Sequence, residues 1–329
     1  MAQFIIGNAF GKIAERHRGL QKFLWRFDFV AVWLLVRVFG LLPVDAASSL
    51  GKHFGRLAGP RLKRKTAMYR ENLSRAFPEK PTVEIEQLIC EGWGNAGRVM
   101  AEYTHFKAIF ASRDRERLHV EMSGGFTTHR QATPPAIYVG AHLNNWEMLI
   151  TALNRLEIPS VALYTPPTNP LLAGLLYEYR RDMDCALVSR DRAAREIIRH
   201  LEQGRSAGLI VDRRLDTGPE VPFFDISKPS TMLPARLALK LGLDLVPTRV
   251  ERLRGAEFRV TFYSPVVASD PRADKNRQAQ DMMSQVHQHF QNWISETPGA
   301  WFCPQRIWPK NALRRSAGQF EQEVDANAA

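Results

Sequence analysis

One short stretch, residues 136–147, places two proton-handling side chains beside a tight turn. Its first apolar residues predict a strand, and the two small residues that follow predict the turn. The two asparagines after the turn can cap a helix whose apolar residues follow at helical spacing. The pattern therefore predicts that His142 precedes a helix and that Glu147 lies in its first turn.

His142 and Glu147 can serve as a general base and its orienting partner. On one continuous helix they would lie about 140° apart, so they can meet only if His142 precedes the helix. Glu147 would then hold the Nδ1 proton and leave Nε2 free to accept a proton from a hydroxyl. No Ser or Cys lies in the stretch, which favours direct attack of an alcohol on a bound acyl group. Because structural histidines also occur at this spacing, the spacing alone leaves both interpretations open.

A second polar group, Asp212-Arg213-Arg214, follows a predicted strand. Open α/β sheets place ligand-binding loops at such positions. The two guanidinium groups can bind phosphate on an acceptor lipid or stabilise an oxyanion, with Asp212 positioning them. The alternative is an internal ion pair at the end of a strand. Arg180, on a predicted helix, has the same two interpretations.

An acyl channel and a metal site are the other features considered. Residues 221–224, Val-Pro-Phe-Phe, can line a channel, because an alkyl chain gains about 0.8 kcal/mol per buried methylene. Adjacent aromatic residues are equally typical of an ordinary core. No HExxH motif is present and no third ligand accompanies His142 and Glu147, so no metal and no cofactor is predicted.

Beyond residue 136, strands and helices alternate. This pattern predicts an α/β fold with a central, mostly parallel sheet flanked by helices. Arg254-Gly255 lies between the last two predicted strands, and this pattern predicts a hairpin. The predicted strands are 137–139, 161–164, 185–188, 207–211, 245–253 and 257–263, and the predicted helices are 146–153, 170–183, 192–203, 232–241 and 274–295.

The N-terminal third is helical by periodicity, with predicted helices at 46–57, after Pro60, and from about Thr82 to Tyr103. Before them, residues 23–42 are rich in aromatic and aliphatic side chains, but three charged residues interrupt the run. The uninterrupted apolar stretch is too short for a free-standing membrane span, which needs about 18 residues. This segment is expected to be a membrane-anchoring helix lying in or dipping into the bilayer; the alternative is a buried core helix.

Composition limits the class of protein. The chain has 329 residues, of which 45% are hydrophobic and 24% charged, and this describes a globular protein rather than a disordered one. The 45 Lys and Arg residues against 34 Asp and Glu residues give a net charge of +11, which favours an anionic partner. Three scattered cysteines predict neither a disulfide framework nor a zinc site. The basic cluster at residues 61–70 is either a solvated helix face or a surface for anionic headgroups or an acidic carrier.

The chain resembles the lipid A biosynthesis (late) acyltransferase family, within the wider His-x4-Asp/Glu acyltransferases. The matching pieces, in chain order, are Arg70-Glu71-Asn72-Leu73 with Ala76-Phe77-Pro78-Glu79, Asn95-Ala96-Gly97-Arg98 with Glu102, His142 to Glu147, Asn169-Pro170 with Arg180, and Asp212-Arg213-Arg214 followed by Gly218 and Val221-Pro222-Phe223-Phe224. The family pattern usually has Gly where this chain has Asp225, and a His-Arg-Arg-Trp-like box where it has residues 304–308. These differences concern the acyl chain and the acceptor position more than the chemistry.

The resemblance implies transfer of a fatty acyl chain from acyl carrier protein to a hydroxyl of an anionic lipid A precursor. It implies His142 and Glu147 as the catalytic dyad, and it favours substrate binding by Arg180, Asp212, Arg213 and Arg214. It also implies work at the cytoplasmic face of the inner membrane, either as a peripheral protein or through a single N-terminal anchor.

The expected organisation is an anchor segment at 1–44, an acyltransferase domain at 45–315 and a flexible tail at 316–329. Two other functions stay open on the sequence. One keeps the chemistry and changes the acceptor to a glycerol phosphate lipid or another glycolipid. The other is a non-catalytic, basic protein that binds membranes or nucleic acid; no nucleic-acid-binding motif is present, so nucleic acid is not an expected partner.

Overall fold

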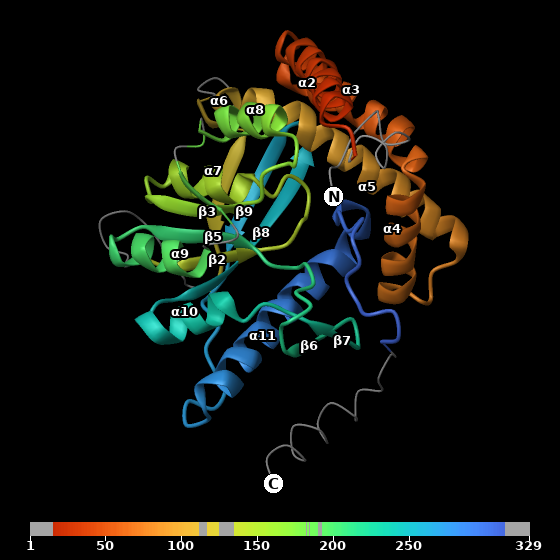
Figure 1. Cartoon of the computed structure of the whole chain (residues 1–329). Helices are drawn as coiled ribbons and strands as arrows, with labels where there is room; N and C mark the ends of the chain where they lie inside the picture. Colours follow the sequence, from red (N-terminus) through yellow and green to blue (C-terminus); the bar gives the residue numbers. More distant parts are fainter. Residues whose placement is uncertain are drawn as a thin grey trace.

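A computed structural model describes residues 16–111, 117–124, 135–181, 183, 185–189 and 193–312. The expected tail at 316–329 lies outside these residues, as do the first 15 residues of the expected anchor segment. Figure 1 shows a sheet at the centre of the molecule, with the N-terminal helices α2 and α3 at the edge opposite α10 and α11.

The described helices and strands follow the predicted alternation. The N-terminal helices are α2 (Arg18–Gly40), α3 (Val44–Ala58), α4 (Lys63–Ala76), α5 (Thr82–Glu102) and α6 (Phe106–Ala111). The remaining elements are β1 (Leu118–Met122), β2 (Ile137–Gly140), α7 (Met148–Arg155), β3 (Ser160–Tyr164), α8 (Pro170–Arg181), β4 (Ala186–Ser189), α9 (Ala193–Glu202), β5 (Ser206–Ile210), β6 (Glu220–Phe223), β7 (Ile226–Pro229), α10 (Leu233–Leu241), β8 (Leu245–Arg254), β9 (Glu257–Phe262) and α11 (Lys275–Glu296).

The central sheet has seven strands in the order β1-β9-β8-β2-β5-β3-β4. Every neighbouring pair is parallel except β8 and β9, which form the predicted hairpin. The fold is therefore α/β with a mostly parallel sheet and a helical N-terminal region. Strands β1, β6 and β7 were not predicted; β6 and β7 pair antiparallel in a separate two-stranded sheet.

Side chains of β2 alternate between two cores, as the period of a strand requires. Ile137 and Val139 join the core built with α4, α5, α10 and α11, whereas Tyr138 joins the core under α7. Because both faces of the sheet are covered, the strand is apolar throughout. This double burial is typical of parallel sheets and fixes the position of the loop that follows β2.

Residues 221–224, considered as a channel lining, belong to the core instead. Phe223 and Phe224 are buried and pack against Trp301 and Trp308, with ring centroids 5.7 to 6.3 Å apart. The left-handed backbone at Phe224, with φ of 53°, and at Asp225, with φ of 56°, forms the turn between β6 and β7. The core interpretation of this motif is therefore the correct one.

Helices α3 and α5 approach closely through glycine. A Cβ atom at Gly51 would lie 2.4 Å from the carbonyl oxygen of Gly97, and one at Gly55 would lie 2.1 Å from that of Trp93. Only glycine permits such a backbone contact. The small residues of α3 therefore face the protein, and its large apolar residues face outward.

Helix α2 also directs an apolar stripe outward. Six exposed residues repeat at intervals of three or four and lie on one face: Phe23, Phe27, Val30, Leu34, Val38 and Leu41. The opposite side packs on the body of the protein, where Asn169 donates a hydrogen bond of 2.9 Å to the carbonyl of Trp25. Among the residues described, no helix is both long enough and apolar enough to cross a bilayer.

Candidate active site

The register of two neighbouring strands brings His142 and Asp212 together. Strands β2 and β5 are parallel, with Gly140 beside Ile210, so the second residue after each strand lies at the same edge of the sheet. Loops at the carboxyl ends of parallel strands are the usual place for ligand-binding groups. The Nδ1 atom of His142 lies 2.5 Å from Oδ1 of Asp212.

Asp212 therefore occupies the position that the sequence assigned to Glu147, and that part of the prediction was wrong. The expected order of histidine, turn and helix is present, but α7 begins at Met148 and Glu147 only precedes it. Asp212 is buried, and its second oxygen accepts a hydrogen bond of 2.9 Å from Nε1 of Trp301. Burial raises its pKa, but His142 and Trp301 lower it more, so the pKa of Asp212 lies below its usual range.

The carboxylate of Glu147 is engaged by two other donors. Arg180 forms an ion pair with it, and the Tyr103 hydroxyl donates a second hydrogen bond to the same oxygen. Arg180 also donates to the Tyr103 hydroxyl at 3.2 Å. Burial lowers the pKa of Arg180 and Glu147 raises it; the carboxylate prevails, so this pKa stays above its ordinary value. The charges of Glu147 and Arg180 therefore neutralise each other. Arg180 forms its ion pair with Glu147 and not with Asp212.

A buried lysine lies behind Asp212. Lys228, on β7, has no solvent exposure, and its Nζ atom donates a hydrogen bond of 2.7 Å to the backbone carbonyl of Asp212. The ammonium also lies 4.6 Å from the ring centroid of Phe223. Burial lowers the pKa of Lys228 to about 7, although the Asp212 carboxylate opposes this effect. This hydrogen bond fixes the backbone of Asp212 and so helps to orient its carboxylate toward His142.

Helix α5 holds the loop that carries His142 and Glu147. The Asn95 side chain donates a hydrogen bond of 2.9 Å to the carbonyl of Asn144, and Asn145 donates one of 2.9 Å to Glu102. Glu102 is fully buried and forms an ion pair with Arg252 of β8. The asparagine and glutamate of the motif at 95–102 thus support the loop rather than the reaction.

Helix α4 holds the C-terminal segment that supplies Trp301. Asn72 donates hydrogen bonds of 2.6 Å to the carbonyls of Cys303 and Gln305, and it accepts one of 3.2 Å from the amide of Ile307. Tyr69 donates to the carbonyl of Trp301. The motif around residue 72 is therefore a clamp for a segment more than two hundred residues later in the chain.

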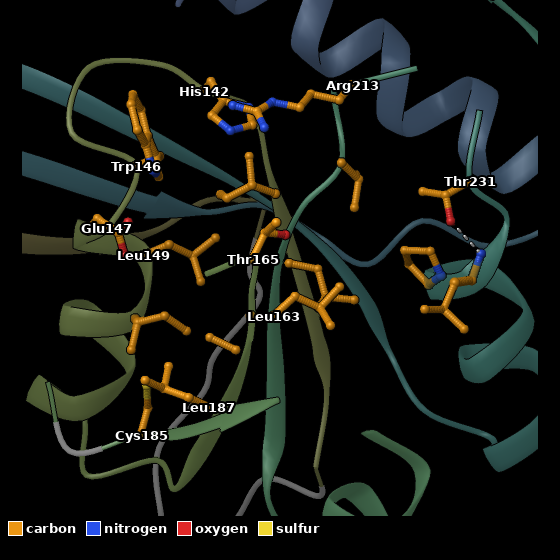
Figure 2. Close-up of a pocket in the computed structure, with 18 of the residues that line it drawn as sticks. His142, Trp146, Glu147, Leu149, Leu163, Thr165, Cys185, Leu187, Arg213 and Thr231 are labelled. Atoms are coloured by element: carbon orange, nitrogen blue, oxygen red, sulfur yellow. Dashed lines mark hydrogen bonds between the residues drawn. The ribbon is translucent and has the colours of Figure 1, made fainter. Parts of the chain in front are cut away.

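Arg213 and Arg214 both line the cavity beside His142. Figure 2 shows the exposed Arg213 side chain directed toward His142. Arg214 pairs with Asp216, with Nε and Oδ1 2.6 Å apart, and donates to the carbonyl of Trp308 at 3.4 Å. Arg214 does not form the alternative ion pair with Asp212, because His142 and Trp301 occupy the Asp212 carboxylate.

The cavity has a volume of about 1090 Å³ and a polar and an apolar part. Figure 2 shows His142 and Arg213 at one end of the view and Leu187 and Cys185 at the other. The apolar walls come from α7, β3, α8, β4 and β5: Leu149, Ile150, Ala162, Leu163, Leu176, Leu187, Gly208, Leu209 and Ile210. Trp146 lies at the polar end, where its ring is 5.0 Å from that of His142.

Sequence reasoning missed Trp301, Lys228 and Tyr103. Each comes from an element remote from residue 142, and none lies in a pattern that points to the histidine. Only the position of Tyr103, directly after the motif at 95–102, offered a signal.

Comparison with known proteins places the chain in a family. Residues 15–310 match the bacterial lipid A biosynthesis acyltransferase family. The chain is 25% identical over 259 residues to the lipid A biosynthesis palmitoleoyltransferase of Escherichia coli strain K12, covering 77% of this chain and 81% of that one. The same values hold for the lipid A biosynthesis acyltransferase of Shigella flexneri.

Among solved structures, the 1-acyl-sn-glycerophosphate acyltransferase PlsC from Thermotoga maritima is similar, with a TM-score of 0.35 and 13% identity over 75% of this chain and 99% of that one. The family match spans nearly the whole described chain and includes every residue of the site above. This chain therefore belongs to the bacterial lipid A biosynthesis acyltransferase family and is an acyltransferase.

Proposed function

We propose that this enzyme transfers a fatty acyl group from acyl carrier protein to a hydroxyl of a lipid A precursor, with His142 as the general base. The pairing of His142 with Asp212 beside a large cavity that has a polar and an apolar part is the observation that carries the proposal. Asp212 rather than Glu147 is the proposed orienting carboxylate. With a proton held on Nδ1, the Nε2 atom of His142 is the free acceptor.

In the proposed reaction, Nε2 of His142 accepts the proton of the acceptor hydroxyl while the hydroxyl oxygen attacks the thioester carbonyl carbon. The Asp212 carboxylate stabilises the imidazolium that forms. Collapse of the tetrahedral intermediate breaks the carbon–sulfur bond, and the departing thiolate takes the proton back from Nε2. An ester and a free carrier thiol result, and no acyl-enzyme is needed.

We assign the fatty acyl chain to the apolar part of the cavity. Each buried methylene gains about 0.8 kcal/mol, and the alkyl chain needs no polar partner. Glu147 and Arg180 line the cavity as an ion pair. Because their charges cancel, an apolar acyl chain can lie next to them. Their proposed role is to keep the cavity open and shaped, with Tyr103 fixing the pair.

Arg213 is the proposed contact for the developing oxyanion or for a phosphate of the acceptor, because its side chain is directed toward His142. Arg214 is held by Asp216 and is proposed to support the loop. A contact made only in the transition state lowers turnover when removed, whereas a contact to bound phosphate raises the apparent KM. Kinetics of Arg213→Ala distinguish these two roles.

Helix α2 is the proposed membrane contact of the enzyme. Its six-residue apolar stripe faces outward, and Arg26 and Arg37 beside it are exposed. A helix with a long apolar face and flanking arginines is suited to lie in the bilayer interface. The proposed acceptor is itself a membrane lipid, so this contact brings the enzyme to its substrate.

Mass spectrometry of lipid A tests the proposed function. Deletion of the gene in its host should remove one fatty acyl chain from lipid A, and expression of the unaltered enzyme should restore it. His142→Ala should fail to restore it, whereas His200→Ala, on α9 outside the cavity, should succeed. Unchanged lipid A in the deletion strain, together with altered glycerophospholipids, would contradict the proposed acceptor.

A purified assay tests the donor. Acyl carrier protein and coenzyme A thioesters of the same acyl chain are compared with one lipid A precursor as acceptor. We expect transfer from the carrier protein and at least tenfold less from coenzyme A. Equal transfer from both donors would contradict a specific role for the carrier protein.

A further inference from the structure

Lys228 places a positive charge in the core directly behind the His142–Asp212 pair. Strand β7 carries this lysine, its side chain is fully buried, and Nζ donates a hydrogen bond of 2.7 Å to the backbone carbonyl of Asp212. Among the described residues its second contact is the Phe223 ring, whose centroid lies 4.6 Å from Nζ. Both contacts are neutral groups, so the ammonium is buried without a direct ion pair, which is a costly arrangement for a charge.

This environment makes the charge of Lys228 depend on pH near neutrality. Burial lowers the pKa of Lys228 to about 7, while attraction to the Asp212 carboxylate keeps it from falling further. The neutral amine needs less solvation than the ammonium, so a buried lysine loses its proton more readily than an exposed one. Lys228 is therefore an ammonium below about pH 7 and a neutral amine above it.

The other titratable groups packed behind the pair keep one charge state near neutral pH. His287 of α11 is buried, and burial followed by repulsion from Lys228 lowers its pKa well below the usual value, so the ring stays neutral. Burial raises the pKa of the Cys303 thiol and that of the Tyr69 hydroxyl, so both groups stay protonated. Of the described groups packed behind the pair, Lys228 is therefore the one whose charge changes in this range.

The charge on Asp212 creates a difficulty that a positive charge on Lys228 removes. The buried carboxylate lies 2.5 Å from Nδ1 of His142, where it favours a protonated ring. A ring that is already protonated cannot accept the proton of the acceptor hydroxyl. The Lys228 ammonium offsets the carboxylate and repels a second positive charge on His142. Arg213 and Arg214 stay charged at every pH near neutrality, so their effect on the ring is constant.

We propose that Lys228 is a positioning residue whose charge compensates Asp212 and so keeps His142 neutral in the resting enzyme. This inference rests on the proposed role of His142 as general base. Lys228 does not line the cavity, so it acts on the reaction through Asp212. It has two separable effects: the hydrogen bond to the Asp212 carbonyl holds the carboxylate in place, and the ammonium adjusts the balance of charge.

The pH dependence of kcat/KM tests the charge effect in the full-length enzyme. Without the Lys228 charge, His142 holds a proton more tightly, and the acid limb of the profile should move to higher pH. We expect a movement of about 0.5 to 1 pH unit in Lys228→Met, since a like charge outside direct contact has a smaller effect than one in contact. A purely structural role would lower the whole profile without moving its acid limb. Lys240→Met, at an exposed lysine of α10, is the control and should leave the profile unchanged.

Lys228→Gln separates the hydrogen bond from the charge. Its amide can still donate to the Asp212 carbonyl but carries no charge. We expect its acid limb to move as far as that of Lys228→Met, with a plateau rate about threefold higher or more, because the hydrogen bond is kept. Thermal unfolding over the same pH range confirms that each variant is folded. A plateau no higher than that of Lys228→Met would refute the part assigned to the hydrogen bond.

Titration of Lys228 by carbon-13 NMR tests the coupling without any substrate. Because the Asp212 carboxylate raises the pKa of Lys228 against the effect of burial, Asp212→Asn should lower this pKa further, by about half a pH unit or more. The measurement uses the native lysine, so it decides the question even where a Lys228 variant fails to fold.

Two results would overturn the proposal. The first is an acid limb in Lys228→Met that coincides with that of the unaltered enzyme. The second is a Lys228 titration that Asp212→Asn leaves unchanged. Failure of the proposed function gives a different result, since His142→Ala would then retain activity. An inactive His142→Ala together with an unmoved acid limb in Lys228→Met would overturn the role of Lys228 alone.

Discussion

Replacing Asp212 by asparagine should change which nitrogen of His142 carries the proton. Asp212 accepts hydrogen bonds from two sides, 2.5 Å from Nδ1 of His142 and 2.9 Å from Nε1 of Trp301. An indole N–H can only donate, so the single oxygen of the introduced amide must face Trp301. The amide nitrogen then faces Nδ1, which has to accept, and the ring proton moves to Nε2. In that tautomer Nε2 cannot accept the proton of the acceptor hydroxyl.

The expected loss follows from the two functions that disappear, proton acceptance and stabilisation of the imidazolium. General-base catalysis contributes about 10²- to 10⁴-fold, and the equivalent substitution in a serine protease triad costs about 10⁴-fold. Asp212→Asn should therefore slow acyl transfer about 10²- to 10⁴-fold, which corresponds to about 3 to 5 kcal/mol of activation free energy. Initial rates with a purified acyl donor and acceptor measure it.

Trp301 provides an internal control for this reasoning. In the double variant Asp212→Asn with Trp301→Phe, no indole holds the amide oxygen, so the amide can turn it toward His142 and restore the productive tautomer. The double variant should be at least tenfold faster than Asp212→Asn alone. Nitrogen NMR of the His142 ring reports the tautomer directly, even if the double variant is unstable. A protonated Nδ1 in Asp212→Asn, or activity within threefold of the unaltered enzyme, would refute the reasoning.

Three further predictions concern single side chains. Glu147→Gln should slow acyl transfer less than Asp212→Asn in the same assay, because the amide still accepts a hydrogen bond from Arg180; the opposite ranking would return the orienting role to Glu147. Burial lowers the pKa of Lys228 from 10.5 to about 7. The buried charged lysine therefore destabilises the folded protein below pH 7, and this destabilisation is lost as the pH rises toward 10.5. The free energy of unfolding of the unaltered enzyme, measured relative to Lys228→Met, should rise by up to about 1.4 kcal/mol per pH unit in that window, and parallel curves would exclude this. Gly55→Ala should lower stability by about 1 to 3 kcal/mol through its clash with the Trp93 carbonyl, seen as a lower Tm with unchanged m-value; an unchanged Tm would mean that α3 can move away.

Local patterns were sufficient for most of the elements, though not for β1, β6 and β7, and for the main catalytic candidate. The alternation of apolar runs and helical periods after residue 136 predicted the α/β sheet, and Arg254-Gly255 marked the hairpin between β8 and β9. His142 stands out because a strand, a small-residue turn and a helix meet at it. These signals are local, since each depends on side-chain period or backbone preference over a few residues.

The partner of the histidine could not be chosen in this way. Glu147 is near His142 in sequence, whereas Asp212 is seventy residues away and reaches it only because β2 and β5 are adjacent and in register. A sequence does not show which strands become neighbours, because pairing depends on the packing of the whole sheet. The same holds for Trp301, which arrives on a segment clamped by Asn72.

The amino-acid sequence by itself determined the family resemblance, the sheet class, the histidine and the apolar, basic character of the N-terminal helices. Tertiary structure alone decided that Asp212 holds the histidine, that Glu147 pairs with Arg180, and that the large residues of α3 face outward. The physical reason is the distance along the chain over which each kind of interaction acts. Periodicity and turn chemistry act between neighbours in the chain, whereas hydrogen-bond partners and exposed faces follow from contacts between remote elements, such as the glycine contact that turns α3 against α5.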